Sequence, residues 1–147
     1  LLDAPSLYSI GLAHKHLPEM QKLAGLDSAP VFVPILGDIR QGMMTSVMLQ
    51  NKLLSGTPTA QDICEMLSSY YEGQEMVRVL PFGGETPRLA TSALAGKDYL
   101  TITVSGHTDQ TLLTAQFDNL GKGASGAAVQ NMNIMLGFPE STGLNID

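Results

Sequence analysis

The sequence feature that most constrains the fold is a pair of short runs rich in strand-forming residues, at residues 99–104 and 111–117. Between the two runs lies the sequence SGHTD, residues 105–109, whose members favour turns. Two such runs at this spacing predict neighbouring strands of a sheet, joined by a tight connection. Any amphipathic helix in the chain would then bury its apolar side against that sheet.

Segments with helical periodicity alternate with strand-like ones along the rest of the chain. The clearest helix begins at Thr57-Pro58, a capping residue followed by proline, and ends at Gly73. Its apolar residues recur at the i, i+3, i+4, i+7 spacing of one helix face: Ile63, Met66, Leu67 and Tyr70. Elsewhere we expect extended segments at residues 7–14, 31–36, 42–54 and 76–80, helices at residues 18–24 and 122–136, and a loop at residues 83–87. This alternation predicts one α+β domain.

The chain carries few charges. Charged residues make up 15% of its 147 residues, and it contains eight methionines. A typical soluble domain has roughly 25% charged residues, so we expect another domain or subunit to cover part of the surface. The formal net charge of −6 argues against nucleic acid and against an anionic membrane as partners, because both attract basic proteins.

Single features exclude several classes of protein. One cysteine, Cys64, provides neither a disulfide framework nor a cysteine-rich zinc site. Asp62 and Glu65 flank it and oppose thiolate formation, so Cys64 is expected to be structural. No apolar stretch approaches the ~18 residues of a membrane span. The first residues, LLDAP, lack the basic region of a signal peptide, so we expect a segment of a longer protein in a reducing cytoplasm.

The densest group of ionisable side chains is at residues 14–19, which read HKHLPE. On a strand, His14 and His16 would point to the same side, immediately before a helix whose first turn holds Glu19. A histidine there can transfer protons near neutral pH, and a neighbouring carboxylate can orient it. Two solvated histidines at a strand end fit the same spacing, and a metal site would need a third ligand that is not evident nearby. The spacing alone leaves these alternatives open.

Residues 121–126, GKGASG, have the G-x-G-x-x-G spacing of a dinucleotide-binding turn. Such a turn needs a complete βαβ unit and an acidic residue about 20 positions later. The sequence shows no second strand, so we reject a dinucleotide site built by this segment. Two interpretations stay open: the helix start presents amides to a polar ligand, or the glycines let the helix pack closely. His107 is expected to be solvated, and the strand methionines to lie in the core or an interface: Met43, Met44 and Met48.

Two of these segments together resemble one family. Residues 14–19 are similar to a motif of N-acetyl-gamma-glutamyl-phosphate reductases (His, Arg or Lys, His, any residue, Pro, Glu). Residues 118–133, DNLGKGASGAAVQNMN, resemble the C-terminal segment of those enzymes nearly residue for residue. The resemblance covers essentially the whole chain but only the C-terminal half of the enzyme. It implies that residues 1–147 are a C-terminal catalytic and dimerisation domain and that the N-terminal NADP-binding Rossmann domain is absent from this chain.

The resemblance implies a fold and a reaction. The fold is a mixed, largely antiparallel sheet with helices on one face, as in the C-terminal domains of glyceraldehyde-3-phosphate-dehydrogenase-like proteins and semialdehyde dehydrogenases. NADP(H) is bound mainly by the Rossmann domain, whose Gly-Cys-Tyr-Pro-Thr motif carries a nucleophilic cysteine that Cys64 does not match. That cysteine attacks the acyl phosphate N-acetyl-glutamyl 5-phosphate, and NADPH reduces the thioester to N-acetyl-glutamate 5-semialdehyde, a step of arginine biosynthesis. The enzyme is expected to be a homodimer or homotetramer, and this fragment alone to be inactive.

The same resemblance assigns roles to individual residues. The catalytic pair is His14, the expected acid/base, and His16, which binds the substrate or supports His14. The substrate-side residues are Tyr8 and Glu19, and the cofactor-side residues are Asn119, Lys122 and Gly123. No metal is expected.

One departure and two alternatives accompany these assignments. Family members commonly have Arg directly followed by Gly after the second strand, whereas here Gln41 separates Arg40 from Gly42, so Arg40 receives no role. The chain is alternatively a non-catalytic dimerisation domain, whose low charge serves an interface and whose histidines are incidental. It is also compared with a related aspartate-semialdehyde dehydrogenase, which the segment at residues 118–133 fits less well.

Overall fold

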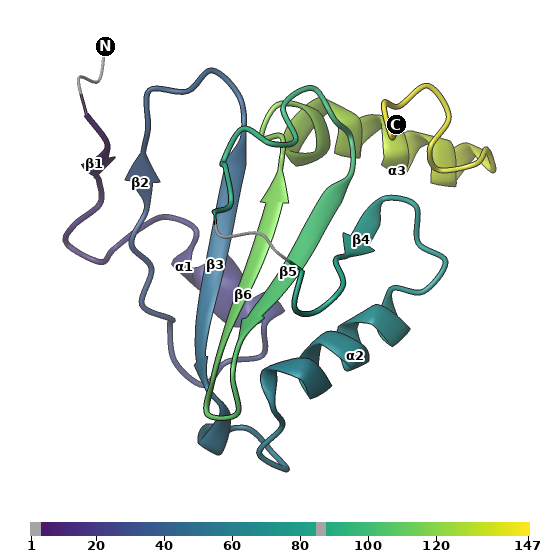
Figure 1. Cartoon of the computed structure of the whole chain (residues 1–147). Coiled ribbons are helices and arrows are strands. Elements are labelled where there is room, and N and C mark those ends of the chain that lie inside the picture. The colour runs from purple at the N-terminus through teal and green to yellow at the C-terminus, as the bar shows by residue number, and fades with distance from the viewer. Residues whose placement is uncertain (1–3, 85–87) are drawn as a thin grey trace. The chain divides into compact units, whose positions relative to one another are not determined.

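A computed structural model describes residues 4–84 and 88–147 of the chain. The chain divides into two compact units, Leu1–Arg40 and Gln41–Asp147, and each unit has its own sheet (Figure 1). Of the loop expected at residues 83–87, residues 85–87 lie outside the described residues, as do the first three residues of the LLDAP sequence.

The smaller unit contains a two-stranded antiparallel sheet and one short helix. β1 (Ser6–Leu7) pairs with β2 (Ile35–Leu36), and α1 (Leu17–Leu23) lies between them in the sequence. The helix predicted at residues 18–24 is confirmed, with proline in the first turn of α1, where a missing N–H costs no helical hydrogen bond. The strand predicted at residues 31–36 is confirmed only at its end. Pro34 stands inside that run and has no N–H to donate to a partner strand.

The larger unit is built on a four-stranded sheet (Figure 1). Its strands are β3 (Met43–Gln50), β4 (Val77–Val79), β5 (Leu100–Gly106) and β6 (Gln110–Phe117). Their spatial order is β3-β6-β5-β4; β6 is antiparallel to β3 and β5, and β4 is parallel to β5. β5 and β6 are the pair predicted from the opening sequence pattern. The expected mixed, largely antiparallel sheet is confirmed.

The predicted amphipathic helix, α2 (Ala60–Tyr70), packs on one face of this sheet. It begins two residues later than expected, because Thr59 and not Thr57 is its capping residue. The Thr59 hydroxyl accepts the N–H of Asp62 at 3.1 Å, and the Asp62 carboxylate accepts the N–H of Thr59 at 2.8 Å. Hydrogen bonds from the side chain and the backbone of Thr59 lower the pKa of Asp62.

The core of the larger unit lies between α2 and the sheet. Its buried apolar side chains are Ala60, Ile63, Cys64 and Val104. Full burial of an aliphatic side chain the size of isoleucine or valine stabilises a fold by about 1.5–3 kcal/mol. The Cys64 thiol is buried here and donates weakly to the Leu80 carbonyl at 3.5 Å, so the expectation of a structural cysteine is confirmed.

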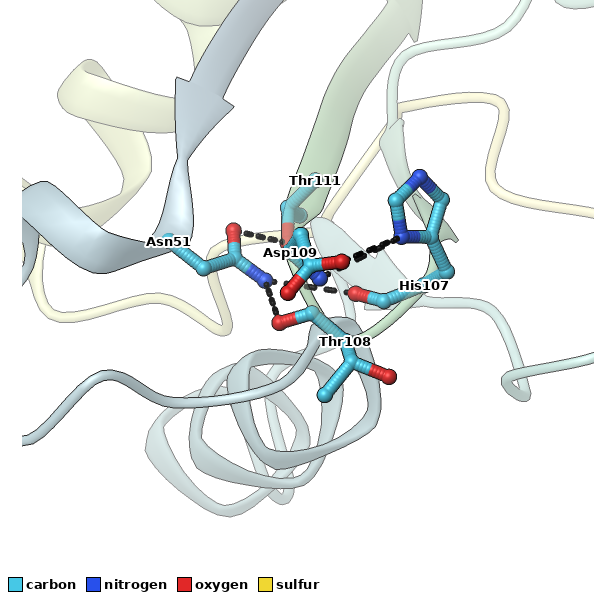
Figure 2. Close-up of polar contacts among 5 residues, drawn as sticks. All are labelled: Asn51, His107, Thr108, Asp109 and Thr111. Carbon is cyan, nitrogen blue, oxygen red and sulfur yellow. Dashed lines mark hydrogen bonds and ion pairs between the residues drawn. The ribbon is translucent and has the colours of Figure 1, made fainter.

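Asn51, directly after β3, anchors the connection between β5 and β6 (Figure 2). Its side-chain amide donates to the carbonyls of His107 at 3.2 Å and Thr108 at 3.0 Å, and its Oδ1 accepts the Thr111 hydroxyl at 2.9 Å. The strand expected to reach residue 54 therefore ends at Gln50, where a 3-10 turn begins. The His107 ring is exposed, as expected, since Asn51 binds only its carbonyl.

The segment after β6 forms a π-helical turn, Gly121–Ser125, followed by α3 (Gly126–Leu136). Gly137 ends α3 in the left-handed conformation at φ 75°. The N–H of Phe138 donates back to the Asn133 carbonyl at 2.9 Å, which completes a glycine-based helix stop. The helix predicted at residues 122–136 and its glycine stop are confirmed.

Large apolar side chains remain exposed on β3 and α3. On the edge strand β3, Met48 is 84% exposed, and Met43 and Met44 are also exposed, so the core placement of these methionines was wrong and the interface placement stays a prediction. On α3, Met135 is 87% exposed. No helix within the described ranges is both long and apolar enough to cross a membrane.

Candidate functional site

The side chains of Tyr8, His14 and His16 form one cluster in the smaller unit. Tyr8 Oη lies 3.3 Å from His14 Nε2, and the ring centroids of His14 and His16 are 4.9 Å apart. Phe32 packs edge-on against His14, with ring centroids 5.1 Å apart. His14 is half-buried, whereas Tyr8 and His16 are exposed. The structure thus brings together three of the four residues predicted for the catalytic and substrate side, and adds Phe32.

The hydrogen bonds of His14 indicate which ring nitrogen handles a proton. The backbone N–H of His16 donates to His14 Nδ1 at 3.2 Å. An Nδ1 that accepts a hydrogen bond carries no proton, so the neutral ring has its proton on Nε2. Nε2–H then donates to Tyr8 Oη, which leaves the Tyr8 hydroxyl proton available to a further acceptor.

A strained turn brings Tyr8 back onto His14. Ser9 and Leu12 have φ values of 54° and 53°, and the N–H of Leu12 donates to the Ser9 carbonyl at 3.0 Å. This left-handed conformation costs on the order of 1–3 kcal/mol in a residue other than glycine and is concentrated at functional sites. The prediction that residues 7–14 are extended was wrong beyond Leu7, because two left-handed residues turn the chain. The histidines meet in the turn before α1 and not by strand alternation.

Glu19 stands apart from this cluster. It lies exposed in the first turn of α1, where a carboxylate interacts favourably with the helix N-terminus. Its side chain has no hydrogen bond or ion pair to any other described residue. Among residues 4–84 and 88–147, no group of three or more His, Cys, Asp or Glu side chains is placed to hold a metal ion.

The residues predicted for the cofactor side lie in the larger unit, around the π-helical turn. Asn119 is exposed, and its Oδ1 accepts the backbone N–H of Gly42 at 2.9 Å, so its side-chain amide nitrogen is the remaining donor. Gly123 donates its N–H to the Asp118 carbonyl at 2.8 Å. Of this pair, only Asn119 offers an exposed side chain to a ligand.

Lys122 is engaged within the chain. Its ammonium donates to Gln130 Oε1, and the Gln130 amide donates to Glu140 at 2.8 Å. Burial lowers the pKa of Lys122, while the charges of Glu140 and Asp98 act in the opposite direction. The lysine predicted on the cofactor side therefore joins the turn to the segment after α3.

The glycines of the G-x-G-x-x-G sequence are explained by packing. A Cβ on Gly121 would lie 2.8 Å from the Lys97 carbonyl oxygen and 2.9 Å from Asp98 Oδ1. A Cβ on Gly126 would overlap the same Asp98 carboxylate. Of the two interpretations left open by the sequence, close packing is the one that this geometry supports.

Sequence reasoning missed Asp118, whose carboxylate is fully buried at the base of the turn. An aspartate two or three residues before a helical turn is a known capping signal, and it was available in the sequence. Its partner Gln41, whose amide donates to Asp118 Oδ2 at 2.9 Å, is 77 positions away and has no local signal.

Comparison with known proteins identifies the family. A family model described as semialdehyde dehydrogenase, dimerisation domain, matches residues 1–119, most of the chain. The chain belongs to this family. The α+β fold expected of semialdehyde dehydrogenase dimerisation domains is the fold described above.

Relatives of this semialdehyde dehydrogenase dimerisation domain carry a more specific name. The chain is 41% identical over 145 residues to N-acetyl-gamma-glutamyl-phosphate reductase 2 of Nostoc sp., covering 94% of this chain and 45% of that protein. It is 44% identical over 144 residues to the reductase 2 of Pseudomonas putida (95% and 46%), and 46% identical over 135 residues to the reductase of Brucella ovis (89% and 44%). The resemblance inferred from residues 14–19 and 118–133 is confirmed. The chain spans less than half the length of each of these relatives.

Proposed function

We propose that this chain is the catalytic and dimerisation domain of an NADP-dependent N-acetyl-gamma-glutamyl-phosphate reductase. It would act in the cytoplasm together with a nucleotide-binding Rossmann domain that also supplies the nucleophilic cysteine. The observation that carries the proposal is the cluster of Tyr8 and His14, in which a half-buried imidazole keeps its proton on the nitrogen that faces a tyrosine hydroxyl. The names of the relatives support the choice of substrate.

The chemistry needs a group that manages protons next to the reacting carbon. Attack of the cysteine thiolate on the acyl phosphate forms a thioester and breaks the bond to phosphate, which leaves. NADPH, when bound, supplies the hydride that reduces this thioester. His14 acts here as the imidazolium: it gives its Nε2 proton to the oxygen that gains charge and becomes the neutral ring. That ring takes the proton back when the carbon–sulfur bond breaks, so that aldehyde and thiolate are released. Tyr8, bound to Nε2, holds the imidazole in orientation and contacts the substrate.

Of the described residues on the cofactor side, one has a side chain placed to bind a cofactor. Asn119 has an exposed amide nitrogen free to donate, whereas Lys122 is paired with Gln130 and the glycines of the turn are packed against Asp98. Asn119 is therefore the side chain here that would hold NADP(H), beside the exposed Gly123. The binding of the phosphates falls to the Rossmann domain.

Exposed apolar side chains support two further contacts of the assembled enzyme. The edge strand β3 exposes Met43, Met44, Val47 and Met48, and we assign these to a contact between subunits of a homodimer or homotetramer. α3 and its end expose Met132, Ile134, Met135, Leu136 and Phe138, and we assign these to the Rossmann domain of the same polypeptide. Burial of both surfaces would account for the low charge of the chain.

The test uses the complete reductase carrying His14→Ala. We expect turnover of N-acetyl-glutamyl 5-phosphate with NADPH to fall by about 10²–10⁴-fold, the usual contribution of a general acid or base. The dissociation constant for NADPH is expected to stay within twofold of wild type. His107→Ala is the matched control, because His107 is exposed on the β5–β6 connection and has no role in the proposal. Near-full turnover by His14→Ala would contradict the assignment of His14 as the general acid and base.

The same exposed surfaces favour a second candidate, a domain that only associates. In that case the histidine cluster has no chemical role, and the function of the domain depends on the exposed apolar residues around Met48. Met48→Lys would then abolish assembly of the complete protein, while His14→Ala would leave turnover unchanged. Light scattering and a turnover assay on both variants separate the two functions.

A further inference from the structure

Asp118, directly after β6, is a fully buried carboxylate to which the proposed reaction assigns no role. Oδ2 accepts the side-chain amide of Gln41 at 2.9 Å and the backbone N–H of Gly96. Oδ1 accepts the backbone N–H groups of Leu120 at 2.7 Å and Gly121 at 3.1 Å. A carboxylate has room for about four such bonds, so Asp118 is fully satisfied.

The charge of this group is maintained by its donors. Burial acts to raise the pKa of Asp118, but the hydrogen bonds from Gly96, Leu120, Gly121 and Gln41 outweigh burial and lower it. The carboxylate is therefore ionised at neutral pH. A buried anion surrounded only by donors is costly to replace by any neutral group, because each lost acceptor leaves a donor unpaired.

The donors come from three separate parts of the larger unit. Gln41 lies two residues before β3, Gly96 precedes β5, and the other two lie at the turn that leads into α3. Asn119 continues the pattern, because its Oδ1 accepts the N–H of Gly42, the residue after Gln41. The consecutive side chains of Asp118 and Asn119 thus bind the turn to Gln41 and Gly42, the two residues that lead into the neighbouring strand.

A second set of bonds holds Gly96 from the other side. The Asn145 side-chain amide donates to the Gly96 carbonyl at 2.8 Å, and the Asn145 N–H donates to Asp98 Oδ2 at 2.9 Å. Asp98 in turn donates its N–H to the Asn145 carbonyl at 2.8 Å. Gly96 is therefore a fixed donor, and the position of Asp118 is set by rigid partners.

We propose that Asp118 is a positioning residue for the cofactor: it fixes the turn so that the Asn119 amide nitrogen is held ready to donate to NADP(H). This inference rests on the proposed function, which places Asn119 at the edge of the cofactor. Asp118 itself is fully buried and cannot touch a ligand, so it acts only through Asn119. A preorganised donor binds more tightly because its ordering has been completed during folding.

The test is Asp118→Asn in the complete reductase, with NADPH binding measured by fluorescence titration in the absence of substrate. The asparagine keeps the shape but turns one acceptor oxygen into a donor, so the Gly96 N–H and the Gln41 amide lose their acceptor. We expect the dissociation constant for NADPH and its KM to rise about tenfold, the effect of one well-placed hydrogen bond. The kcat at saturating NADPH is expected to stay within about threefold, because the proton chemistry of His14 is untouched.

The control is Thr114→Val, which removes another buried hydrogen bond of β6, to Ser46 at 3.2 Å, without reaching the turn. It is expected to lower stability and leave the NADPH dissociation constant unchanged. Should Asp118→Asn fail to fold, Gln41→Met removes one donor, keeps the carboxylate with its three backbone donors, and is expected to weaken NADPH binding about threefold.

The outcomes separate this inference from the proposed function. A wild-type reductase that neither binds NADPH nor turns over the acyl phosphate contradicts the proposed function. A wild-type enzyme that does both, with Asp118→Asn or Gln41→Met that bind NADPH as wild type does, contradicts the positioning role alone. A fall in kcat with an unchanged dissociation constant would also overturn it.

Discussion

Asn51 and Asp118 are both 0% exposed and lie at the two ends of the ribbon formed by β3 and β6. One donates hydrogen bonds to backbone carbonyls, and the other accepts them from N–H groups. Asn51 follows the end of β3 and donates to two carbonyls of the β5–β6 connection (Figure 2). Asp118 follows the end of β6 and accepts from four donors, two of which are N–H groups at the start of a helical turn. The two residues are similar in size and differ in whether they can donate.

The unpaired backbone groups at each end of the ribbon determine which buried side chain is needed there. A tight connection between strands leaves carbonyls without partners, and an amide can donate to them. The start of a helical turn leaves N–H groups without partners, and a carboxylate accepts them best. In our account Asn51 maintains only the fold, whereas Asp118 also holds Asn119, which we propose contacts the cofactor.

The largest effect on stability is expected from Asn51→Asp, which places at the Asn51 end the type of side chain found at the Asp118 end. The introduced carboxylate cannot donate to the carbonyls of His107 and Thr108, and it buries a charge with only the Thr111 hydroxyl as donor. We expect the free energy of unfolding in urea to fall by about 3–5 kcal/mol. Lys52→Ala, at the exposed neighbouring position, should change it by less than about 0.5 kcal/mol. A loss below about 1 kcal/mol for Asn51→Asp would contradict the requirement for a donor at this end.

The reverse exchange, Asp118→Asn, is expected to cost about 3 kcal/mol at pH 7, since buried donors lose their acceptor. Folding lowers the pKa of Asp118, so the stability that its ionised form contributes is present above the unfolded-state pKa of about 4. That contribution is lost as the pH falls toward the lowered pKa of the folded state. Thermal unfolding should therefore show wild type and Asp118→Asn converging below about pH 4. For Asn51→Ala, which removes no titrating group, the difference from wild type should stay constant over the same range.

A smaller loss is expected from Gly126→Ala, which tests whether the turn at the Asp118 end is tightly packed. The added Cβ would overlap the Asp98 carboxylate and lie 2.8 Å from the Gly121 carbonyl oxygen. We expect a loss of about 2 kcal/mol in the free energy of unfolding. Gly84→Ala is the control, because among the described residues its Cβ would meet the Pro81 carbonyl oxygen alone, at 3.6 Å. Equal stability of the two variants would mean that the turn can shift enough to accept the added methyl group.

The smallest effect is expected at the Asn51 end, from His107→Ala. Asn51 binds the carbonyl of His107 and not its ring. The exposed ring accepts the N–H of Asp109 at Nδ1, at 3.2 Å, and lies 3.9 Å from the Asp109 carboxylate. Exposed contacts of this kind contribute little, so the free energy of unfolding should change by less than about 0.5 kcal/mol. A larger loss would show that the ring, and not only the backbone, holds the connection.

The parts of the fold that the sequence predicted well are those with strong local patterns. β5 and β6 follow from their strand-forming runs, and α2 follows from its 3.6-residue periodicity. The strands of the smaller unit were predicted poorly, because many of its apolar residues are exposed and so do not mark a buried face. Val31, for example, is 83% exposed although it begins a continuous apolar run.

The candidate site divides in the same way. His14 and His16 were recognisable from their motif, but the contact of Tyr8 with His14 depends on a turn at Ser9 and Leu12 whose left-handed conformation no periodicity indicates. The role of Asp118 depends on a partner 77 positions away, so it was visible only once β3 and β6 were paired. The residues follow from the sequence, and their contacts follow from tertiary structure.

The proposed role of His14 as the proton donor of the reduction step can be tested by one transient kinetic measurement. The complete reductase with His14→Ala is mixed with N-acetyl-glutamyl 5-phosphate, first without NADPH and then with it. We predict a burst of phosphate of about one per active site in the first mixture, because thioester formation does not need His14. In the second mixture, oxidation of NADPH should be slower than in wild type by about 10²-fold or more. Oxidation of NADPH at the wild-type rate would contradict the claim.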